Sequence, residues 1–586
     1  MAKELFTQVP RKLKNIIDEV ESGKLGLPEL QRGYVWKAPK VRDLLDSMMK
    51  GYPIGYLMIW DSSDSQKIKN IGTDNKPYSA PKSLIIDGQQ RMTSLYAVMR
   101  HKEVMDEKYN QRFITISFNP FTRTFEVGDN AKKKATDWIY DISDVFLNEP
   151  RSFDYITEFV QFVQENREKA GGILAGAEKQ TVQQNIMDLL ALGDYNIPTL
   201  EINGNSNEES VADIFVRVNS GGEKLGEDDF ILTLISVYWQ EGRQKIEEFC
   251  KSAKVPKTGT AYNFLFEPSP THIVRVVMSY GFKRARLNYA YKLLRGRDFE
   301  TEVYSEKLRE EQFVKLKIVL GKVLNVQTWH DFLKSIEAAG FVSKSLISAQ
   351  NALVYTYALY LIGKHEYSMK ETELRKIIAK WFFMASVSGY YTSSPETVVE
   401  ADLADLRNIT TGAEFIALLE GKIVAVFTND YFNVTLPNDL ATSSSRSPVW
   451  FGYCAALNAL GAKVLFSTLT TRELFSPAAT GTKNALERHH LFPKAYLGKI
   501  GITDDRDRNQ NANFAFIEWH DNIEILDTSP AEYMKDQLVK IPPADKSSIY
   551  ELHALPDCWE NTDYFDFLKQ RRALMAQVIK KGFERL

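Results

Sequence analysis

The segment 486–494 contains two adjacent histidines, His489 and His490, directly before an apolar turn that ends at Pro493. An extended backbone directs neighbouring side chains to opposite faces, so we expect the two imidazoles on opposite sides of a strand. One imidazole can then hold a metal ion while the other, uncharged, takes a proton from water. The pattern is typical of a metal-dependent hydrolase; a pair of ordinary surface or core histidines is the alternative.

A second chemical pattern joins a compact apolar strand, expected at 83–86, to a helix expected at 92–99. The connection is Asp87-Gly88-Gln89-Gln90-Arg91. Glycine lets a backbone approach a ligand closely, and a helix N-terminus offers unpaired N–H groups to phosphate. Arg91 can pair with phosphate oxygens, and Asp87 can hold a metal ion or a water. The pattern favours phosphate binding; a buried Asp87–Arg91 pair that braces the turn is the alternative.

The length of the chain, 586 residues, excludes a single hydrophobic core, so we expect several domains. The net charge of −3 means that any nucleic-acid surface is a local patch. The three cysteines form neither a zinc spacing nor a disulfide framework, which suits a reducing cytoplasm. The N-terminus is no signal peptide, and the most apolar stretch, 352–363, is shorter than the roughly 20 residues of a membrane span.

Hydrophobic periodicity indicates three kinds of region. Residues 1–235 mix strands and helices, and their helices are expected at 13–20, 40–50, 156–169 and 180–192. Residues 236–440 are mostly helical, with helices at 306–323, 349–363 and 372–388. Residues 441–586 begin with a Ser-rich linker candidate, 443–448, then have a helix and a strand within 447–467 and a closing helix at 564–583.

A run of basic residues in the helical region has two interpretations. Six cations lie within fifteen residues, with Tyr289 and Tyr291 between them: Lys283, Arg284, Arg286, Lys292, Arg295 and Arg297. Cations interleaved with tyrosines can hold phosphates and stack bases. A solvated helical face gives the same pattern.

The histidine segment resembles the HNH nuclease motif, a hairpin followed by a helix that binds one divalent metal ion. His489, His490 and the Leu-Phe-Pro turn follow the order of that motif, and Asn513 and Asn522 have its spacing. The resemblance implies that His489 and Asn522 bind Mg²⁺ or Mn²⁺ and that His490 is the general base. It also implies that Asn513 orients the loop or His490. The first metal ligand here is His instead of the commoner Asp.

The N-terminal region, roughly residues 8–240, resembles the ParB-like nucleotide hydrolases. Three motifs carry the resemblance: Gln31-Arg32-x-Tyr34-x-Trp36, the Asp87–Arg91 segment, and a Phe-x-x-x-Asn element that contains Arg217 and Asn219. It implies a nucleoside triphosphate, GTP or ATP, bound by Gln31, Arg32, Asp87, Gly88, Gln89, Gln90, Arg91, Arg217 and Asn219. Asp87 and Gln90 are expected near the phosphates or the attacking water.

Both motif sets in this order resemble the GmrSD-type and SspE-like restriction nucleases of bacteria. The resemblance implies an α+β multidomain chain: a ParB-like α/β domain (1–235), a helical domain (236–440) and a ββα-metal HNH domain (441–586). It implies an antiphage, cytoplasmic enzyme that hydrolyses a nucleoside triphosphate and cleaves or nicks phage or modified DNA.

Expected partners of such an enzyme are DNA, the nucleotide and, as an open option, a second copy of the chain; no membrane is expected. Arg488 and Lys494 are candidates to hold neighbouring phosphates. A nucleotide-switched DNA-binding regulator and an RNA-directed nuclease toxin are the alternatives.

Overall fold

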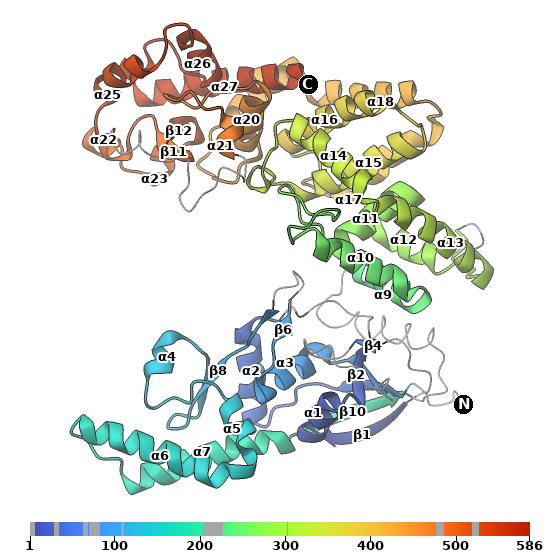
Figure 1. Cartoon of the computed structure of the whole chain (residues 1–586), viewed down its shortest axis with the longest axis vertical. Coiled ribbons are helices and arrows are strands. Elements are labelled where there is room, and N and C mark those ends of the chain that lie inside the picture. The colour runs from blue at the N-terminus through green and yellow to red at the C-terminus, as the bar shows by residue number, and fades with distance from the viewer. Residues whose placement is uncertain are drawn as a thin grey trace. The chain divides into compact units, whose positions relative to one another are not determined.

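A computed structural model describes the chain at residues 6–28, 34, 36–61, 68–69, 83–106, 111–202, 227–299, 301, 303–475, 486–518, 525 and 527–586. The chain divides into two compact units, Met1–Gln244 and Lys245–Leu586 (Figure 1). It is mixed α/β and mainly helical, with small sheets, as the sequence predicts. The predicted domain boundaries at 235 and 440 stay predictions.

The first unit contains a six-stranded mixed sheet whose central neighbours are β3 (Leu57–Asp61) and β5 (Ser83–Asp87). These two strands are antiparallel, while β5 is parallel to β2 (Leu25–Pro28). The remaining members are β10 (Asn196–Ile202), parallel to β3, with β1 (Phe6–Lys12) antiparallel to β10 and β4 (Ile68–Lys69) antiparallel to β2. The strand before the Asp87–Arg91 segment therefore lies inside the sheet.

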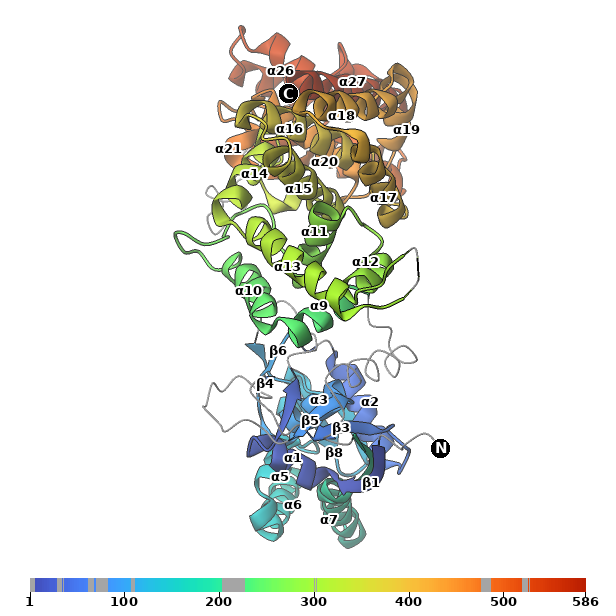
Figure 2. The ribbon, with the colours of Figure 1, turned by 90° about the vertical axis from the view of Figure 1, so that its right-hand side faces the viewer.

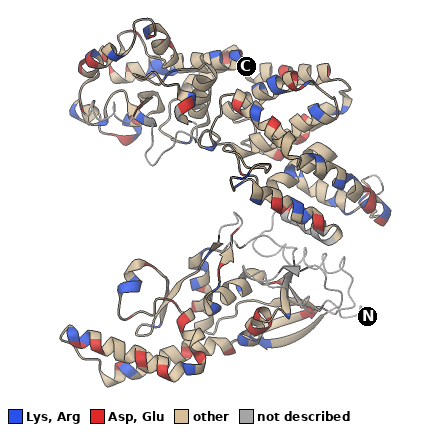
Figure 3. Cartoon of the chain, in the orientation of Figure 1, with Lys and Arg blue, Asp and Glu red and all other residues tan. Residues whose placement is uncertain are grey.

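Long helices complete the first unit. Figures 1 and 2 both show α6 (Ser152–Lys169) alongside α7 (Gly176–Leu190). Lys and Arg positions alternate with Asp and Glu positions along these helices and along the ribbons of both units (Figure 3). This mixture agrees with the small net charge of the chain, which allows a surface of one sign only as a local patch.

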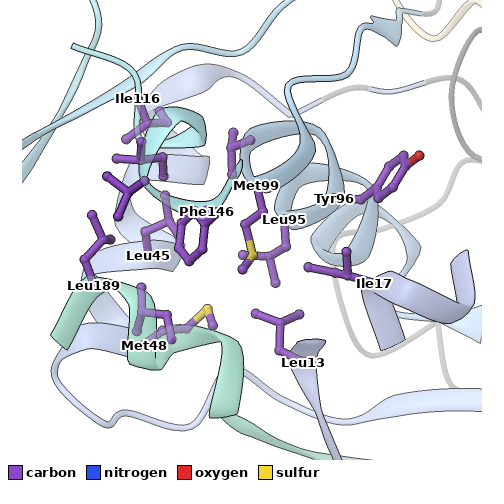
Figure 4. Packing of buried hydrophobic residues seen from close by; sticks show 14 of the residues in the cluster. Leu13, Ile17, Leu45, Met48, Leu95, Tyr96, Met99, Ile116, Phe146 and Leu189 are labelled. Carbon is purple, nitrogen blue, oxygen red and sulfur yellow. The ribbon is translucent and has the colours of Figure 1, made fainter. Parts of the chain in front are cut away.

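The core of the first unit is a cluster of buried hydrophobic side chains contributed by several helices (Figure 4). The helix α1 (Leu13–Glu21) buries residues spaced three and four apart, which is the spacing of one helical face. The helix α3 (Gln89–Arg100) packs against both α1 and α2 (Ala38–Met49), and the shared core includes Leu45, Met48, Leu95 and Met99. The start of α3 is thus anchored by core packing along its length.

The second unit begins as a stack of helices around α15 (Gln350–His365). Its residues from Ala352 to Gly363 are all buried, because α11 (Pro270–Phe282) and α16 (Glu371–Val387) pack on it. Full burial explains why this apolar stretch shows no amphipathic pattern. Among the described residues, no helix combines the length and apolar character that crossing a membrane requires.

Part of the basic run is neutralised inside the second unit. Arg284 donates a hydrogen bond to Glu400 at 2.7 Å, and Lys283 donates one to Glu366 at 2.5 Å. Arg284 also lies over the rings of Tyr289 and Phe299 at 5.9 and 6.0 Å. At these two positions the cations act as internal partners.

The C-terminal part of the second unit is built on two packed helices, α20 (Pro448–Ala459) and α27 (Tyr564–Arg585). Gly582 allows their close approach, because a Cβ atom there would lie 2.5 Å from Cβ of Ala456. The predicted helix within 447–467 is confirmed, but the predicted strand there is wrong. The chain after α20 turns back sharply, and only an isolated bridge joins Lys463 to Thr470.

The Ser-rich segment 443–448 is bonded to the C-terminal part of this unit. Asn511 donates its backbone N–H to the carbonyl of Thr442 at 2.8 Å and its side-chain amide to the carbonyl of Ser444 at 3.1 Å. The segment therefore packs beside residues 511–513 and does not act as a free linker.

Arg571 on α27 is fully buried and holds two distant backbone carbonyl groups. Its guanidinium donates hydrogen bonds to Ala512 O at 2.7 Å and to His553 O at 3.1 and 3.3 Å. His553 is buried as well, and its Nε2 lies 2.9 Å from the carbonyl oxygen of Lys463. Burial lowers the pKa of His553 to about 4, and the charge of Arg571 acts in the same direction.

This pKa predicts a loss of stability in acid. The ordinary pKa of His553, 6.5, applies to the unfolded chain, so between pH 6.5 and about 4 the unfolded state binds the extra proton. The free energy of unfolding should therefore fall by up to about 3 kcal/mol as the pH falls through this window, and no further from this group below it. Urea unfolding of the parent and of His553→Gln at pH 7 and pH 4.5 measures the difference.

The His553→Gln variant should lose less stability than the parent on acidification. His101→Gln, which removes a half-exposed histidine from the other unit, is the control. Equal acid sensitivity of the parent and His553→Gln would contradict the assignment.

Candidate functional site

The two adjacent histidines lie on the first strand of a hairpin in the second unit. Strand β11 (Leu486–His490) pairs antiparallel with β12 (Phe514–Glu518). His489 is opposite Ala515 and His490 is opposite Phe514. Successive residues of a strand face opposite sides, so the sheet separates the two imidazoles.

His489 occupies the buried face of the hairpin. Its side chain is 3% exposed, and its ring meets the ring of Tyr533 edge-on, with centroids 5.9 Å apart. The hydroxyl of Tyr533 donates to the carbonyl of Leu491 at 2.7 Å. The first histidine is therefore packed against the helix α25 (Pro530–Gln537), which carries Tyr533.

His490 occupies the other face and is half-buried. Its ring lies 4.4 Å, centroid to centroid, from the ring of Phe514 directly across the hairpin. Its Nε2 is 3.0 Å from the side-chain oxygen of Asn509. Two contacts from different elements therefore fix the imidazole.

The surroundings of His490 favour its uncharged form. Burial lowers its pKa most; the hydrogen bond with Asn509 raises it, and the positive charges of Lys494, Arg488 and Arg508 lower it again. The outcome is a pKa below the ordinary 6.5. At neutral pH the imidazole can then accept a proton, which a general base must do.

Asn513 holds the turn that follows the histidines. It is fully buried, and its side-chain oxygen accepts a hydrogen bond from the N–H of Phe492 at 2.9 Å. Its amide donates to the carbonyl groups of Phe492 and Arg508, both at 3.1 Å. These contacts hold the loop in place, while the described side chain that hydrogen-bonds His490 is Asn509.

The closing helix supports the same loop. Phe492 packs against Phe567 and Tyr564 of α27, with centroids 4.9 and 5.3 Å apart. The hydroxyl of Tyr564 donates to the carbonyl of Asp507 at 2.7 Å. Two points of the loop 491–513, Phe492 and Asp507, are therefore attached to α27.

Arg488 and Lys494, which we considered as phosphate ligands, both have internal partners. The guanidinium of Arg488 lies over the rings of Phe514 and Trp450 at 4.1 and 5.0 Å and donates to Asn511 at 3.1 Å. Lys494 pairs with Asp505 at 2.8 Å. Arg488 thus joins the hairpin to α20 and the Ser-rich segment.

In the first unit, the Asp87–Arg91 segment is a tight strand-to-helix turn. Gly88 has φ +87°, a conformation that side chains disfavour, and a Cβ there would lie 3.0 Å from Leu57. Gln89 is buried and donates a hydrogen bond to the carbonyl of Ile85. Gln90 is half-buried, and its carbonyl accepts from the hydroxyl of Ser94 at 2.6 Å.

Arg91 turns back onto the segment before β3. Its guanidinium donates to the carbonyl of Ile54, to that of Tyr56 at 2.7 Å and to Asp87 at 3.4 Å. Gly55 makes room for it, because a Cβ there would lie 2.6 Å from Nη1 of Arg91. Burial lowers the pKa of Arg91, and Asp87 opposes that shift. This geometry favours the bracing interpretation for Arg91.

The early motif and the Asp87–Arg91 helix meet through a tyrosine. Tyr34 is buried, and its hydroxyl lies 2.7 Å from the hydroxyl of Ser94 on α3. Burial raises the pKa of Tyr34 to about 12. Gln31, Arg32, Arg217, Asn219 and Asn522 lie outside the described residues.

Two functional residues had no assigned role in the sequence analysis. Asn509 gave no signal beyond its place between the histidines and Asn513. Arg571 did give one, because it falls on the apolar face of the predicted closing helix, with Phe567, Leu568 and Met575. Within the described ranges, no three His, Cys, Asp or Glu side chains gather closely enough to hold a metal ion.

Comparison with known proteins identifies the N-terminal region. Residues 13–236 match the family described as GmrSD restriction endonuclease, N-terminal domain. This part of the chain is therefore similar to the N-terminal domain of GmrSD restriction endonucleases. The chain is also similar to an uncharacterized protein of Methanocaldococcus jannaschii, with 19% identity over 574 residues that cover 90% of this chain and 87% of that protein.

The bracing contacts of Arg91 predict a stability effect without any ligand. Arg91→Ala leaves two carbonyl groups and Asp87 without their cation, so the free energy of unfolding of the first unit should fall by about 1–3 kcal/mol. Arg91→Lys should recover only part, since an ammonium group cannot reproduce the planar fork. Thermal unfolding in nucleotide-free buffer measures both variants.

Arg42→Ala is the matched control, because the half-exposed Arg42 hydrogen-bonds its neighbour Asp43 on the same helix. If the unfolding temperature of Arg91→Ala in nucleotide-free buffer equals that of the parent, the bracing role is refuted and phosphate binding is left as the role of Arg91.

Proposed function

We propose that this chain is an antiphage restriction endonuclease. Its active site for cleaving or nicking DNA contains the hairpin histidines, and its N-terminal unit hydrolyses a nucleoside triphosphate. The observation that carries the proposal is the hairpin itself. It separates His489 and His490 on two faces, holds the half-buried His490 in contact with Phe514 and Asn509, and fixes the Pro turn through Asn513. Burial lowers the pKa of His490 and so favours its uncharged form. A GmrSD-like region in the same chain supports DNA as the substrate.

In the proposed reaction, His490 takes a proton from a water molecule. The water oxygen bonds to the phosphorus of the scissile phosphate, and the bond from phosphorus to the leaving sugar oxygen breaks. A divalent ion, Mg²⁺ or Mn²⁺, would stabilise the negative charge on that leaving oxygen. Its proposed ligands are His489 and Asn522, of which the structure describes only His489. An imidazole nitrogen and an amide oxygen are suitable donors for such an ion.

The N-terminal unit is proposed to bind GTP or ATP at the start of α3. The phosphates would meet backbone N–H groups at the start of α3, and Asp87 and Gln90 are the proposed groups near the phosphates or water. Gln31, Arg32, Arg217 and Asn219 complete the proposed site. Arg91 and Gln89 support it from within, since their hydrogen bonds go to the protein backbone. Nucleotide turnover would control cleavage, because an uncontrolled nuclease would cut the host's DNA.

Replacing His490 tests the nuclease directly. His490→Ala should lower the rate of DNA cleavage by about 10²-fold or more, a typical general-base contribution, while the variant stays folded. The measurement is cleavage of plasmid and phage DNA, modified and unmodified, with RNA offered in parallel.

Activity of the parent should stop in EDTA and return with Mg²⁺ or Mn²⁺. Cleavage that survives chelation, or a folded His490→Ala variant that cuts at the parent rate, would refute the assigned chemistry. Binding of DNA with no cleavage by the parent would favour the regulator, and cleavage of RNA alone would favour the toxin.

Replacing Asp87 tests nucleotide turnover and its coupling to cleavage. Asp87→Ala should abolish hydrolysis of the nucleoside triphosphate and should also change the rate or the nucleotide response of DNA cleavage. Both activities are measured on one preparation, with exposed Asp43→Ala on α2 as the control. Loss of hydrolysis with unchanged cleavage in every nucleotide would show that the two units act independently.

A further inference from the structure

The contact between Asn509 and His490 assigns different roles to the two ring nitrogens of the histidine. Nε2 of His490 is 3.0 Å from the side-chain oxygen of Asn509. A carboxamide oxygen accepts hydrogen bonds and cannot donate them, so this contact is a hydrogen bond in the tautomer that has the ring proton on Nε2. In an uncharged imidazole the other nitrogen, Nδ1, then carries the lone pair.

Asn509 is held in place by groups that do not touch His490. It directly follows the short helix α23 (Asp505–Arg508), and its N–H donates to the carbonyl of Asp505 at 3.0 Å. Buried Asn513 donates to the carbonyl of Arg508, and Tyr564 donates to that of Asp507. The backbone before Asn509 is therefore anchored from both the hairpin and α27.

The charged groups near the ring are three cations and one carboxylate, which forms ion pairs with two of the cations. Arg488, Lys494 and Arg508 influence His490 from three elements, and Asp505 is paired with Lys494 at 2.8 Å and with Arg508 at 2.9 Å. The neutral Asn509 is the side chain that hydrogen-bonds the ring. An uncharged acceptor fixes the direction of the imidazole and stabilises its protonated form less than a carboxylate would.

Building on the proposed nuclease function, we infer that Asn509 is a positioning residue for His490. It holds the imidazole with its proton on Nε2 and thereby presents the lone pair of Nδ1 to the attacking water. The proton from water goes to Nδ1, while Asn509 retains its hydrogen bond to Nε2–H throughout. The ring of Phe514, tilted at 47° to the imidazole with centroids 4.4 Å apart, restricts the remaining rotation.

The first test reads the tautomer without activity. The full chain is labelled with ¹⁵N-histidine, and the signals of His490 among the eight histidines are assigned by their absence in His490→Gln. At neutral pH, two-bond ¹⁵N–¹H spectra of the parent should show the proton on Nε2 and slow exchange of that proton with solvent. Asn509→Ala should lose the slow exchange, and Asn509→Asp, which keeps an acceptor oxygen, should retain it.

The second test reads catalysis of DNA with Mg²⁺. Asn509→Ala should lower kcat by about tenfold or more with little change in KM, since a misdirected base affects the chemical step. Asn509→Asp should recover part of kcat. Gln510→Ala is the matched control: it removes the neighbouring amide, whose hydrogen bond goes to the carbonyl of Arg506, and should leave kcat unchanged.

The two tests fail separately. A parent whose His490 carries its proton on Nδ1, or an Asn509→Ala variant with parental exchange and kcat, overturns the role of Asn509. A parent that cleaves no nucleic acid with any metal overturns the proposed nuclease, while the spectra still decide whether Asn509 fixes the tautomer.

Discussion

The buried guanidinium of Arg571 is the interaction on which the C-terminal part of the chain depends. Transferring a cation from water to a protein interior is unfavourable, and among the described residues no carboxylate pairs with it. Its compensation is a set of hydrogen bonds to the carbonyl groups of Ala512 and His553. Ala512 lies between Asn511 and Asn513, so the closing helix fixes the very residues that hold the loop after the histidines.

Buried asparagines then convert this anchoring into a defined loop. Asn513 binds both backbone groups of Phe492, and Asn511 links Arg488 with the Ser-rich segment. Each amide offers donors and an acceptor at once, so a single side chain can satisfy backbone groups that a buried turn leaves unpaired. The half-buried His490, the proposed general base, lies beside this polar network on the other face of the hairpin.

Local patterns in the sequence predict much of this arrangement. The helix at 306–323 is confirmed as α13 (Glu306–Val323), and the hairpin faces follow from strand alternation. The partners of the arginines could not be predicted, because a guanidinium that holds a phosphate and one that holds carbonyl groups have the same sequence pattern. The strand expected after α20 is wrong. The chain turns at Gly461 and Phe466, both with φ +67°, so this segment makes an isolated bridge from Lys463 to Thr470 and a hydrogen bond from Leu465 to Phe516 of β12.

Arg91 and Arg571 solve the same physical problem in two units. Each guanidinium donates hydrogen bonds to carbonyl oxygens of a segment that is distant in sequence or irregular in conformation. The ammonium group of a lysine lacks the planar set of donors that this requires. In the first unit, Arg91 fixes the segment that leads into β3 against the start of α3. The turn at Asp87 and Gly88 is thereby held in place without a ligand, which would lower the entropy lost in the proposed binding of a phosphate group there.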